Sequence, residues 1–250
     1  QIPGNDADSG GGVFLTGAGS THLFDNLIYD NKGVWGGGVY LHYGHYTLES
    51  QVVSGNTARF GSGCYVKRSS NALFDSNVFR DNLGEHRGII QLVRSGNADF
   101  ENCVIADNEV HGSGIGSGLH LDMSSASLLH STIARNTAKN GAGLHLKGAS
   151  TAMLTNTLFV SHSVGLTVTS GSTASLQGTL WGSGAWANEV DWGGSGSIVT
   201  GDHNFRGDPG FVAPETGDYH IGPNSAAIDR GVDAGLTADK DGNPRPLGAA

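Results

Sequence analysis

Short apolar segments alternate with polar residues and glycines along most of the chain, and one phrase returns at a nearly constant interval. The phrase begins with an Asn and leads to a Gly followed by alternating apolar and polar residues, as in Asn136 and Gly143-Leu144-His145-Leu146. Its Asn recurs every 25 to 28 residues, at Asn31, Asn56, Asn82, Asn108 and Asn136. This period predicts a solenoid, in which each coil buries its apolar face against its neighbours.

Two strands can be recognised in each repeat. The segment before each Asn, such as Leu128 to Asn136, is short, alternating and rich in β-branched or aromatic residues, and the Gly-led segment alternates in the same way. No 11-residue window has a helical period. A coil of this size with two or three strands corresponds to one turn of a β-helix, whose strands pair at about 4.8 Å. We therefore predict an all-β, single-stranded right-handed parallel β-helix (solenoid) of about seven coils with a C-terminal cap.

The repeated Asn has a structural explanation. At a fixed corner of the coil, stacked Asn side chains can bond to each other and to backbone groups that would otherwise be buried without partners. A sixth copy of the phrase has His162 in this place, and a seventh has Gly184. We predict a structural ladder at this corner and no catalytic role.

The repeat is lost from about residue 182. Three of the four tryptophans (Trp181, Trp186 and Trp192) follow closely on one another there, and five of the six prolines lie at or beyond Pro209. Because the end of a solenoid is an exposed sheet edge that must be covered, we predict coils over residues 1–184 and a folded-back cap and tail over 185–250.

Composition narrows the range of functions. The 41 glycines lie at regular places that suit coil corners, and the net charge of -9 argues against a nucleic-acid groove or an anionic membrane surface. Without a run of 18 apolar residues, no membrane span is predicted. The chain has no signal peptide and begins with Gln, so we expect a processed or trimmed chain. Cys64 and Cys103 do not make a disulfide framework, and Cys64 is expected to be a buried free thiol.

Three motifs carry a family resemblance. They are Asn-Thr-Ala and Gly-Ala-Gly-Leu-His-Leu within 136–146, the tail of 207–231 with Gly-Asp-Pro-Gly-Phe-Val and Asn-Ser-Ala-Ala-Ile-Asp-Arg-Gly, and Asp-Lys-Asp-Gly-Asn-Pro-Arg-Pro at 239–246. Residues 11–184 resemble the pectin-lyase-like right-handed parallel β-helix repeat proteins of bacteria, and the tail is similar to that of secreted or surface-anchored members. The resemblance implies an extracellular protein with a polysaccharide partner, although the same coil serves lyases, hydrolases, epimerases and adhesins.

The Gly-led strands predict two outward columns of side chains, because alternate residues of a strand face the same way. Gln91 belongs to them if Ile89, and not Gly88, aligns with the repeated glycines, since a slip of one residue would invert the faces. The first column contains Phe14, Tyr40, Tyr65, Gln91, His120, His145 and Thr167. The second contains Thr16, His42, Lys67, Val93, Asp122, Lys147 and Thr169, with Arg94 nearby. In pectin-lyase-like enzymes the substrate groove is similar to this face.

These columns contain the groups that a polysaccharide lyase needs: a cation for the uronate carboxylate, a base and an acid. The candidate bases are His120 and His145, and Tyr65 or the other His is the candidate acid. The candidate cations are Lys67, Arg94 and Lys147, with Asp122 beside Lys147, and the candidate substrate-binding residues are Tyr40, His42, Tyr65 and Gln91. The alternative is an ordinary solvated sheet face on which an Asp122–Lys147 pair contributes at most about 1 kcal/mol.

Hydrolysis and metal chemistry are less favoured. A glycoside hydrolase uses two carboxylates roughly 5 to 9.5 Å apart, and the columns offer only Asp122. A metal on His120, His145 and Asp122 is conceivable but needs supporting residues around it, so we predict no metal.

Asp239-Lys240-Asp241-Gly242 is similar to the start of a calcium loop but lacks the remaining ligands. We interpret it as a turn and predict no cofactor, with calcium as the alternative.

Pairs of adjacent apolar residues indicate a second surface. Because neighbours in a strand face opposite ways, one residue of each pair faces outward, and such a stripe is larger than a monomer usually leaves bare. The pairs are Leu27-Ile28, Val52-Val53, Val78-Phe79, Val104-Ile105, Leu158-Phe159 and Leu180-Trp181. We expect the stripe to dock the C-terminal tail, another domain or a second copy of the chain.

Two functions follow. The first is a secreted protein that binds or degrades an extracellular polysaccharide, with lyase-like action on an acidic glycan. The alternative is a non-catalytic cell-surface protein, an adhesin or a self-assembling filament protein.

Overall fold

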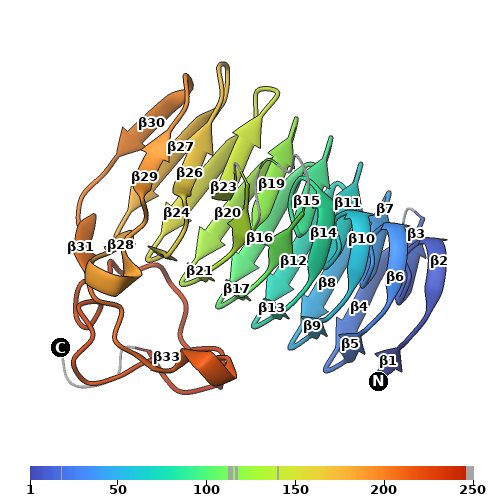
Figure 1. The fold of residues 1–250 in the computed structure, drawn as a ribbon, viewed down its shortest axis with the longest axis horizontal. Helices are drawn as coiled ribbons and strands as arrows, with labels where there is room; N and C mark the ends of the chain where they lie inside the picture. Colours follow the sequence, from blue (N-terminus) through green and yellow to red (C-terminus); the bar gives the residue numbers. More distant parts are fainter. Residues whose placement is uncertain (18, 112–114, 116–117, 140, 246–250) are drawn as a thin grey trace.

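The chain forms a parallel β-solenoid of about 8 turns in the computed structural model (Figure 1). The structure describes residues 1–17, 19–111, 115, 118–139 and 141–245, so residues 246–250 of the predicted cap lie outside the description. The predicted all-β parallel fold is confirmed. Most coils contribute four strands, one to each of four parallel sheets, whereas the sequence analysis expects two or three.

The sheets are named A to D in the order in which the chain visits them. Sheet A contains β1 (Ile2–Pro3), β5 (Leu27–Tyr29), β9 (Val52–Ser54), β13 (Val78–Arg80), β17 (Val104–Ala106), β21 (Thr132–Ala134), β25 (Leu158–Val160), β28 (Leu180–Gly182) and β31 (Phe205–Gly207). Sheet B contains β2 (Asp6–Ser9), β6 (Lys32–Trp35), β10 (Thr57–Phe60), β14 (Leu83–His86), β18 (Glu109–Val110) and β22 (Thr137–Ala138). Sheet C contains β3 (Val13–Thr16), β7 (Val39–His42), β11 (Cys64–Lys67), β15 (Ile90–Val93), β19 (Leu119–Asp122), β23 (Ala142–Lys147), β26 (Val164–Val168) and β29 (Val190–Gly193). Sheet D contains β4 (Ser20–Phe24), β8 (His45–Glu49), β12 (Asn71–Asp75), β16 (Asn97–Glu101), β20 (Ser125–Leu129), β24 (Thr151–Thr155), β27 (Thr173–Gln177) and β30 (Ser197–Thr200).

The core is a narrow column inside the four sheets. In sheet A the central residue of each strand from β5 to β28 points inward, and in most strands of sheet C the first and third residues do so, as with Val39 and Leu41. Equivalent side chains stack from coil to coil: the rings of Phe74 and Phe100 lie parallel with centroids 4.6 Å apart. Cys64 and Cys103 are both buried and free, as expected for Cys64.

The predicted Asn ladder occupies the corner between sheets A and B. The backbone N–H and the side-chain Nδ2 of Asn56 both donate to Oδ1 of Asn82 at 3.0 Å, and the same Nδ2 donates to the Ile28 carbonyl at 2.9 Å. Asn5 and Asn188, which the sequence analysis misses, extend the ladder, and the backbone N–H of His162 donates to Asn188 Oδ1 at 3.0 Å. Each Asn side chain of the ladder therefore forms hydrogen bonds with backbone groups of two coils.

The other corners use shorter side chains for the same purpose. Between sheets C and D, the backbone N–H of Ser95 donates to Ser124 Oγ, and that of Ser124 donates to Ser150 Oγ, each at 3.1 Å. Between sheets D and A, the backbone N–H of Gln51 donates to Asn77 Oδ1 at 2.8 Å. Buried corner donors therefore find partners in the next coil.

The solenoid continues beyond residue 184, where the recognisable repeat ends. β29, β30 and β31 still pair in parallel with β26, β27 and β28, so the last coil is built from residues 190–207. This segment belongs to the predicted cap, because Asn188 is not followed by the Gly-led phrase. Asp191 is buried at the position of the repeated glycine and pairs with Arg206.

A tail, defined as residues 208–245, folds back along the outer side of sheet A, as Figure 1 shows below β28, β21 and β17. It contains the 3-10 helix η2 (Pro214–Thr216) and the antiparallel strands β32 (Phe211–Ala213) and β33 (Asp218–Ile221), and a second 3-10 helix, η1 (Gly184–Trp186), precedes it. Tyr219 packs on the outward residues Ala106, Ala134 and Val160, and its hydroxyl donates to Asp107 Oδ2 at 2.6 Å.

The tail covers part of the apolar stripe. Val104 and Leu158 pack against the cluster that contains Tyr219, and Leu180 is 1 % exposed within it. The tail therefore lies on the stripe at these coils. Leu27 and Val52 stay half-buried outside that cluster, and self-association through them remains a prediction.

The segment of residues 239–243, which the sequence analysis interprets as a turn, is one. Oδ1 of Asp239 accepts the backbone N–H groups of Asp241 and Asn243 at 2.9 and 2.8 Å.

No helix in the described part of the chain is long and apolar enough to cross a membrane.

The Asn ladder predicts a large loss of stability on truncation. In Asn82→Ala, the backbone N–H and Nδ2 of Asn56 lose their acceptor in a buried corner, and we expect the free energy of unfolding to fall by about 2 to 4 kcal/mol. Urea unfolding measures this change. Asn71→Ala is the control, because Asn71 is exposed on sheet D, and an equal loss in both variants would contradict the ladder.

Candidate functional site

The strand register brings the predicted columns together on the outer face of sheet C. Tyr65 pairs with Tyr40 and Gln91, and Gln91 pairs with His120, which pairs with His145. The alignment of Ile89 with the repeated glycines is therefore correct. The second column follows in the same register: His42, Lys67, Val93, Asp122 and Lys147 are successive partners.

The expectation that these side chains face solvent is wrong for the middle of the first column, from Tyr40 to His145. Gln91 and His120 are each 1 % exposed, His145 is 5 % exposed, and Tyr40 and Tyr65 are each 7 % exposed. Side chains stacked at the strand spacing shield one another, and the segment before β15 lies across the face. A Cβ on Gly88 would stand 2.7 Å from the Cβ of His120, so this close approach requires glycine.

The N-terminal half of the face is aromatic. The ring of Tyr40 lies between those of Phe14 and Tyr65, with centroid distances of 5.1 and 5.2 Å. The rings of His42 and Tyr43 are 4.1 Å apart. Phe14 is 47 % exposed and Tyr43 is 44 % exposed, so this half offers aromatic surface to solvent.

Three cations flank the aromatic half, and we call them the cation row: Lys67, Arg68 and Arg94. Arg68 and Arg94 are exposed and occupy the positive-φ corners that follow β11 and β15. The Arg68 guanidinium donates to the Tyr43 hydroxyl at 2.5 Å and lies 5.7 Å from the centre of its ring. Among the residues that the structure describes, no carboxylate forms an ion pair with any member of the row.

The C-terminal half of the face is polar and closed. The imidazole rings of His120 and His145 are stacked, with centroids 5.0 Å apart and planes inclined by 5°. Beside them Oδ2 of Asp122 accepts from both Lys147 Nζ at 2.9 Å and Arg87 Nη1 at 3.2 Å. We call Arg87, Asp122 and Lys147 the Asp122 triad. The expected Asp122–Lys147 pair is present, but the Asp122 side chain is only 13 % exposed, so it is not a surface pair.

Sequence reasoning misses Arg87 and Arg68. Arg87 directly follows β14, at the positive-φ corner that Gly36 and Gly61 occupy in the preceding coils, and it reaches the face from outside the columns. Arg68 follows the last residue of its column, and the recurrence of Arg at the equivalent corner of the next coil, Arg94, is the signal that could have identified it.

Burial sets the protonation states of the closed half. Burial, followed by the positive charges of His145, Arg87 and Lys147, holds the pKa of His120 well below its usual value. Burial and the charge of Lys147 lower the pKa of His145 to about 4. Burial raises the pKa of Tyr65 to about 12. At neutral pH the imidazoles are therefore neutral but weak bases, and Tyr65 is a poor proton donor.

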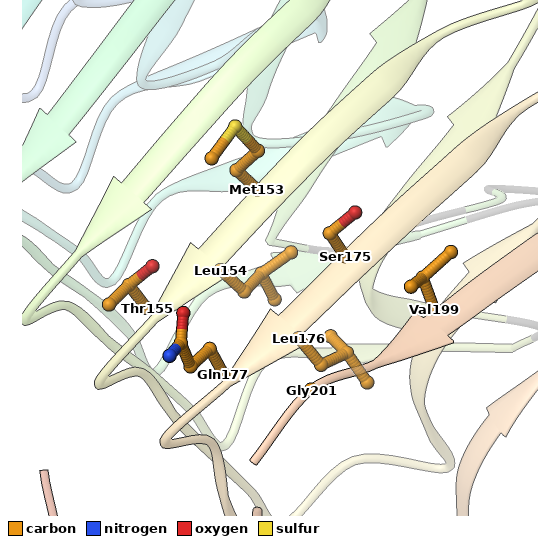
Figure 2. Close-up of a pocket in the computed structure, with 8 residues that line it drawn as sticks. All are labelled: Met153, Leu154, Thr155, Ser175, Leu176, Gln177, Val199 and Gly201. Carbon is orange, nitrogen blue, oxygen red and sulfur yellow. The ribbon is translucent and has the colours of Figure 1, made fainter. Parts of the chain in front are cut away.

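Other regions offer less chemistry. Figure 2 shows a depression on the outer face of sheet D, where Met153, Ser175 and Val199 lie in register on β24, β27 and β30. Its lining has no titratable side chain, so it provides no acid or base. In the described part of the chain, no group of three His, Cys, Asp or Glu side chains is arranged to hold a metal.

The lowered imidazole pKa values predict a pH dependence of stability. Because the unfolded chain binds protons at a higher pH than the folded His145 does, the free energy of unfolding falls as the pH drops from about 6.5 towards 4. We expect His145→Gln to flatten this slope, measured by urea unfolding at pH 7, 6 and 5. His22→Gln, an exposed control, should keep it, and an unchanged slope in His145→Gln would contradict a buried neutral imidazole.

Comparison with known proteins agrees with this architecture. A family model described as "Right handed beta helix region" matches residues 7–180, which is more than half of the 250-residue chain. No curated protein and no solved structure matches it. The stacked parallel coils and this match lead to the same conclusion: the chain belongs to the right-handed β-helix family.

Proposed function

We propose that this protein binds an acidic polysaccharide outside the cell, along the outer face of sheet C. The observation that carries the proposal is the cation row beside exposed aromatic rings. In a chain of net charge -9, an acidic polymer is repelled by most of the surface. Lys67, Arg68 and Arg94 have no carboxylate partner among the described residues, so their charges are available to a ligand.

The shape of the face supports a long, linear ligand. The columns repeat at about 4.8 Å along the solenoid, so a chain lying along its axis meets equivalent positions on successive coils. Phe14 and Tyr43 provide apolar ring surface, and Arg68 and Arg94 provide fixed forks of donors that match carboxylates. Uronates combine both features, because each sugar ring carries a carboxylate.

Lyase-like cleavage of the same polymer is the second candidate. It is supported by the neutral imidazoles of His120 and His145 next to Lys147 and Arg87, which supply the base and the cation of an elimination. Against it stand the burial of His120, the lowered pKa values of both imidazoles, which make them weak bases, and the raised pKa of Tyr65, which makes its hydroxyl a weak acid. Binding is therefore favoured over cleavage.

The binding proposal predicts that removing two cations weakens affinity. We expect Arg68→Ala/Arg94→Ala to bind polygalacturonate about tenfold more weakly than the parent protein, since two charge-assisted contacts together contribute on the order of 1.4 kcal/mol. Isothermal titration calorimetry measures the affinity, and added salt should weaken it.

Arg59→Ala is the matched control, because Arg59 is an exposed arginine on sheet B, and its affinity should equal that of the parent. An absorbance assay for unsaturated products, with His120→Ala/His145→Ala as the inactive reference, tests cleavage. Failure of the parent to bind any of polygalacturonate, alginate and hyaluronate would overturn the proposal. A concentration-dependent increase in mass together with that failure would instead support a self-assembling surface protein.

A further inference from the structure

Two cations share one carboxylate in the closed half of the face. Arg87 Nη1 and Lys147 Nζ both approach the same oxygen of Asp122, at 3.2 and 2.9 Å. The side chains of Arg87 and Lys147 are 39 % and 34 % exposed, whereas that of Asp122 is 13 % exposed. The cations therefore remain reachable from solvent, while the carboxylate lies on their inner side. With both imidazoles neutral, the group retains a net positive charge.

Of the ten buried side-chain atoms without partners in the described part of the chain, four lie next to this triad. Among the described residues, no hydrogen bond of normal geometry reaches the buried Oε1 of Gln91, Nδ1 of His145 or the ring nitrogens of His120, although the Ile115 backbone approaches the His120 ring. Each such atom destabilises the fold by about 1 to 3 kcal/mol, and unpaired groups of this kind are rare in folded proteins. They lie on three successive coils of one column, on the same face as Asp122 and Lys147. An isolated packing defect does not explain three neighbouring positions.

We propose that Arg87 and Lys147 form a carboxylate-binding subsite for a single uronate residue, which Asp122 occupies as an internal substitute for the ligand. The proposal deepens the proposed function and rests on it for the sugar that carries the carboxylate. A uronate carboxylate takes the two cations from Asp122, and Arg87 moves with it away from the imidazoles. The sugar hydroxyl groups then bond to Gln91, His120 and His145.

The exchange is physically balanced. One carboxylate replaces another on the same two cations, and the guanidinium fork of Arg87 can bind the incoming carboxylate with two parallel hydrogen bonds. The displaced Asp122 carboxylate, 13 % exposed, loses both cations, and this cost opposes binding to the parent protein. The gain comes from the unpaired atoms of the column, which acquire hydroxyl partners. Binding to the parent protein is weakened by the competing Asp122, and this gives the proposal its distinguishing prediction.

Asp122→Asn should bind the uronate monomer more tightly than the parent protein. We expect D-galacturonate to bind Asp122→Asn at least about fivefold more tightly and Arg87→Gln at least about fivefold more weakly, because a fivefold change corresponds to about 1 kcal/mol. Calorimetry measures the affinities. Nuclear magnetic resonance reports whether the His120 and His145 imidazole signals shift on binding.

Asp99→Asn is the matched control, since Asp99 is a half-buried carboxylate on sheet D, and galactose is the neutral probe. Asp99→Asn should bind D-galacturonate with the affinity of the parent protein. Galactose should neither bind nor shift the imidazole signals. Equal or weaker binding of D-galacturonate to Asp122→Asn overturns the subsite. If circular dichroism shows that Asp122→Asn is unfolded, Arg87→Gln decides: unchanged monomer binding overturns the subsite, and weakened binding supports it.

The two proposals fail separately. Polygalacturonate binding that depends on Arg68 and Arg94, without any D-galacturonate effect on the imidazoles, removes the subsite and leaves the proposed function. Imidazole shifts with D-galacturonate, without any binding of polymers, keep the subsite and remove the proposed function.

Discussion

The hydrogen bond from one Asn side chain to the next is the interaction on which the rest of the structure depends. The corner between sheets A and B is buried, and its backbone N–H groups have no strand partner within their own coil. Oδ1 of Asn82 accepts from Asn56, and Oδ1 of Asn108 accepts from Asn82, each at 3.0 Å. This fixes the rise between coils and therefore the register of all four sheets, since the strands between the corners are only two to six residues long.

That register explains why chemically related side chains gather on sheet C. Once the corners are aligned, Tyr40 must lie beside Tyr65, and His120 beside His145. The face that results is divided: its N-terminal half is aromatic and flanked by the cation row, and its C-terminal half is closed by the Asp122 triad. One repeated strand thus supports an open binding surface and a covered polar cluster within a few coils of each other.

The periodic features of the molecule could be predicted from the sequence, and the aperiodic ones could not. The Asn ladder, the position of Gln91 and the inward Cys64 follow from residues that recur at fixed intervals. The burial of His120 depends on Gly88, whose backbone lies against the His120 side chain, and this coil departs from the repeat because Arg87 takes the positive-φ corner that Gly36 and Gly61 occupy in the preceding coils. The last coil escaped detection because Asp191 replaces the glycine of the phrase and only Asn188 remains.

The tail forms hydrogen bonds with some coils of the solenoid and does not contact others. It bonds to Asn102 through the carbonyl of Ala238, and Asn156 exchanges two hydrogen bonds with the backbone of Val232. In a stack where each repeat normally contacts only its neighbours, such a brace links distant repeats into one cooperative unit. Amide hydrogens of β7 and β11 should therefore exchange with solvent by local fraying, whereas those of β19 and β23 should exchange only when the brace is released. The aromatic half of the face belongs to the loosely held end, and the imidazole half to the braced one.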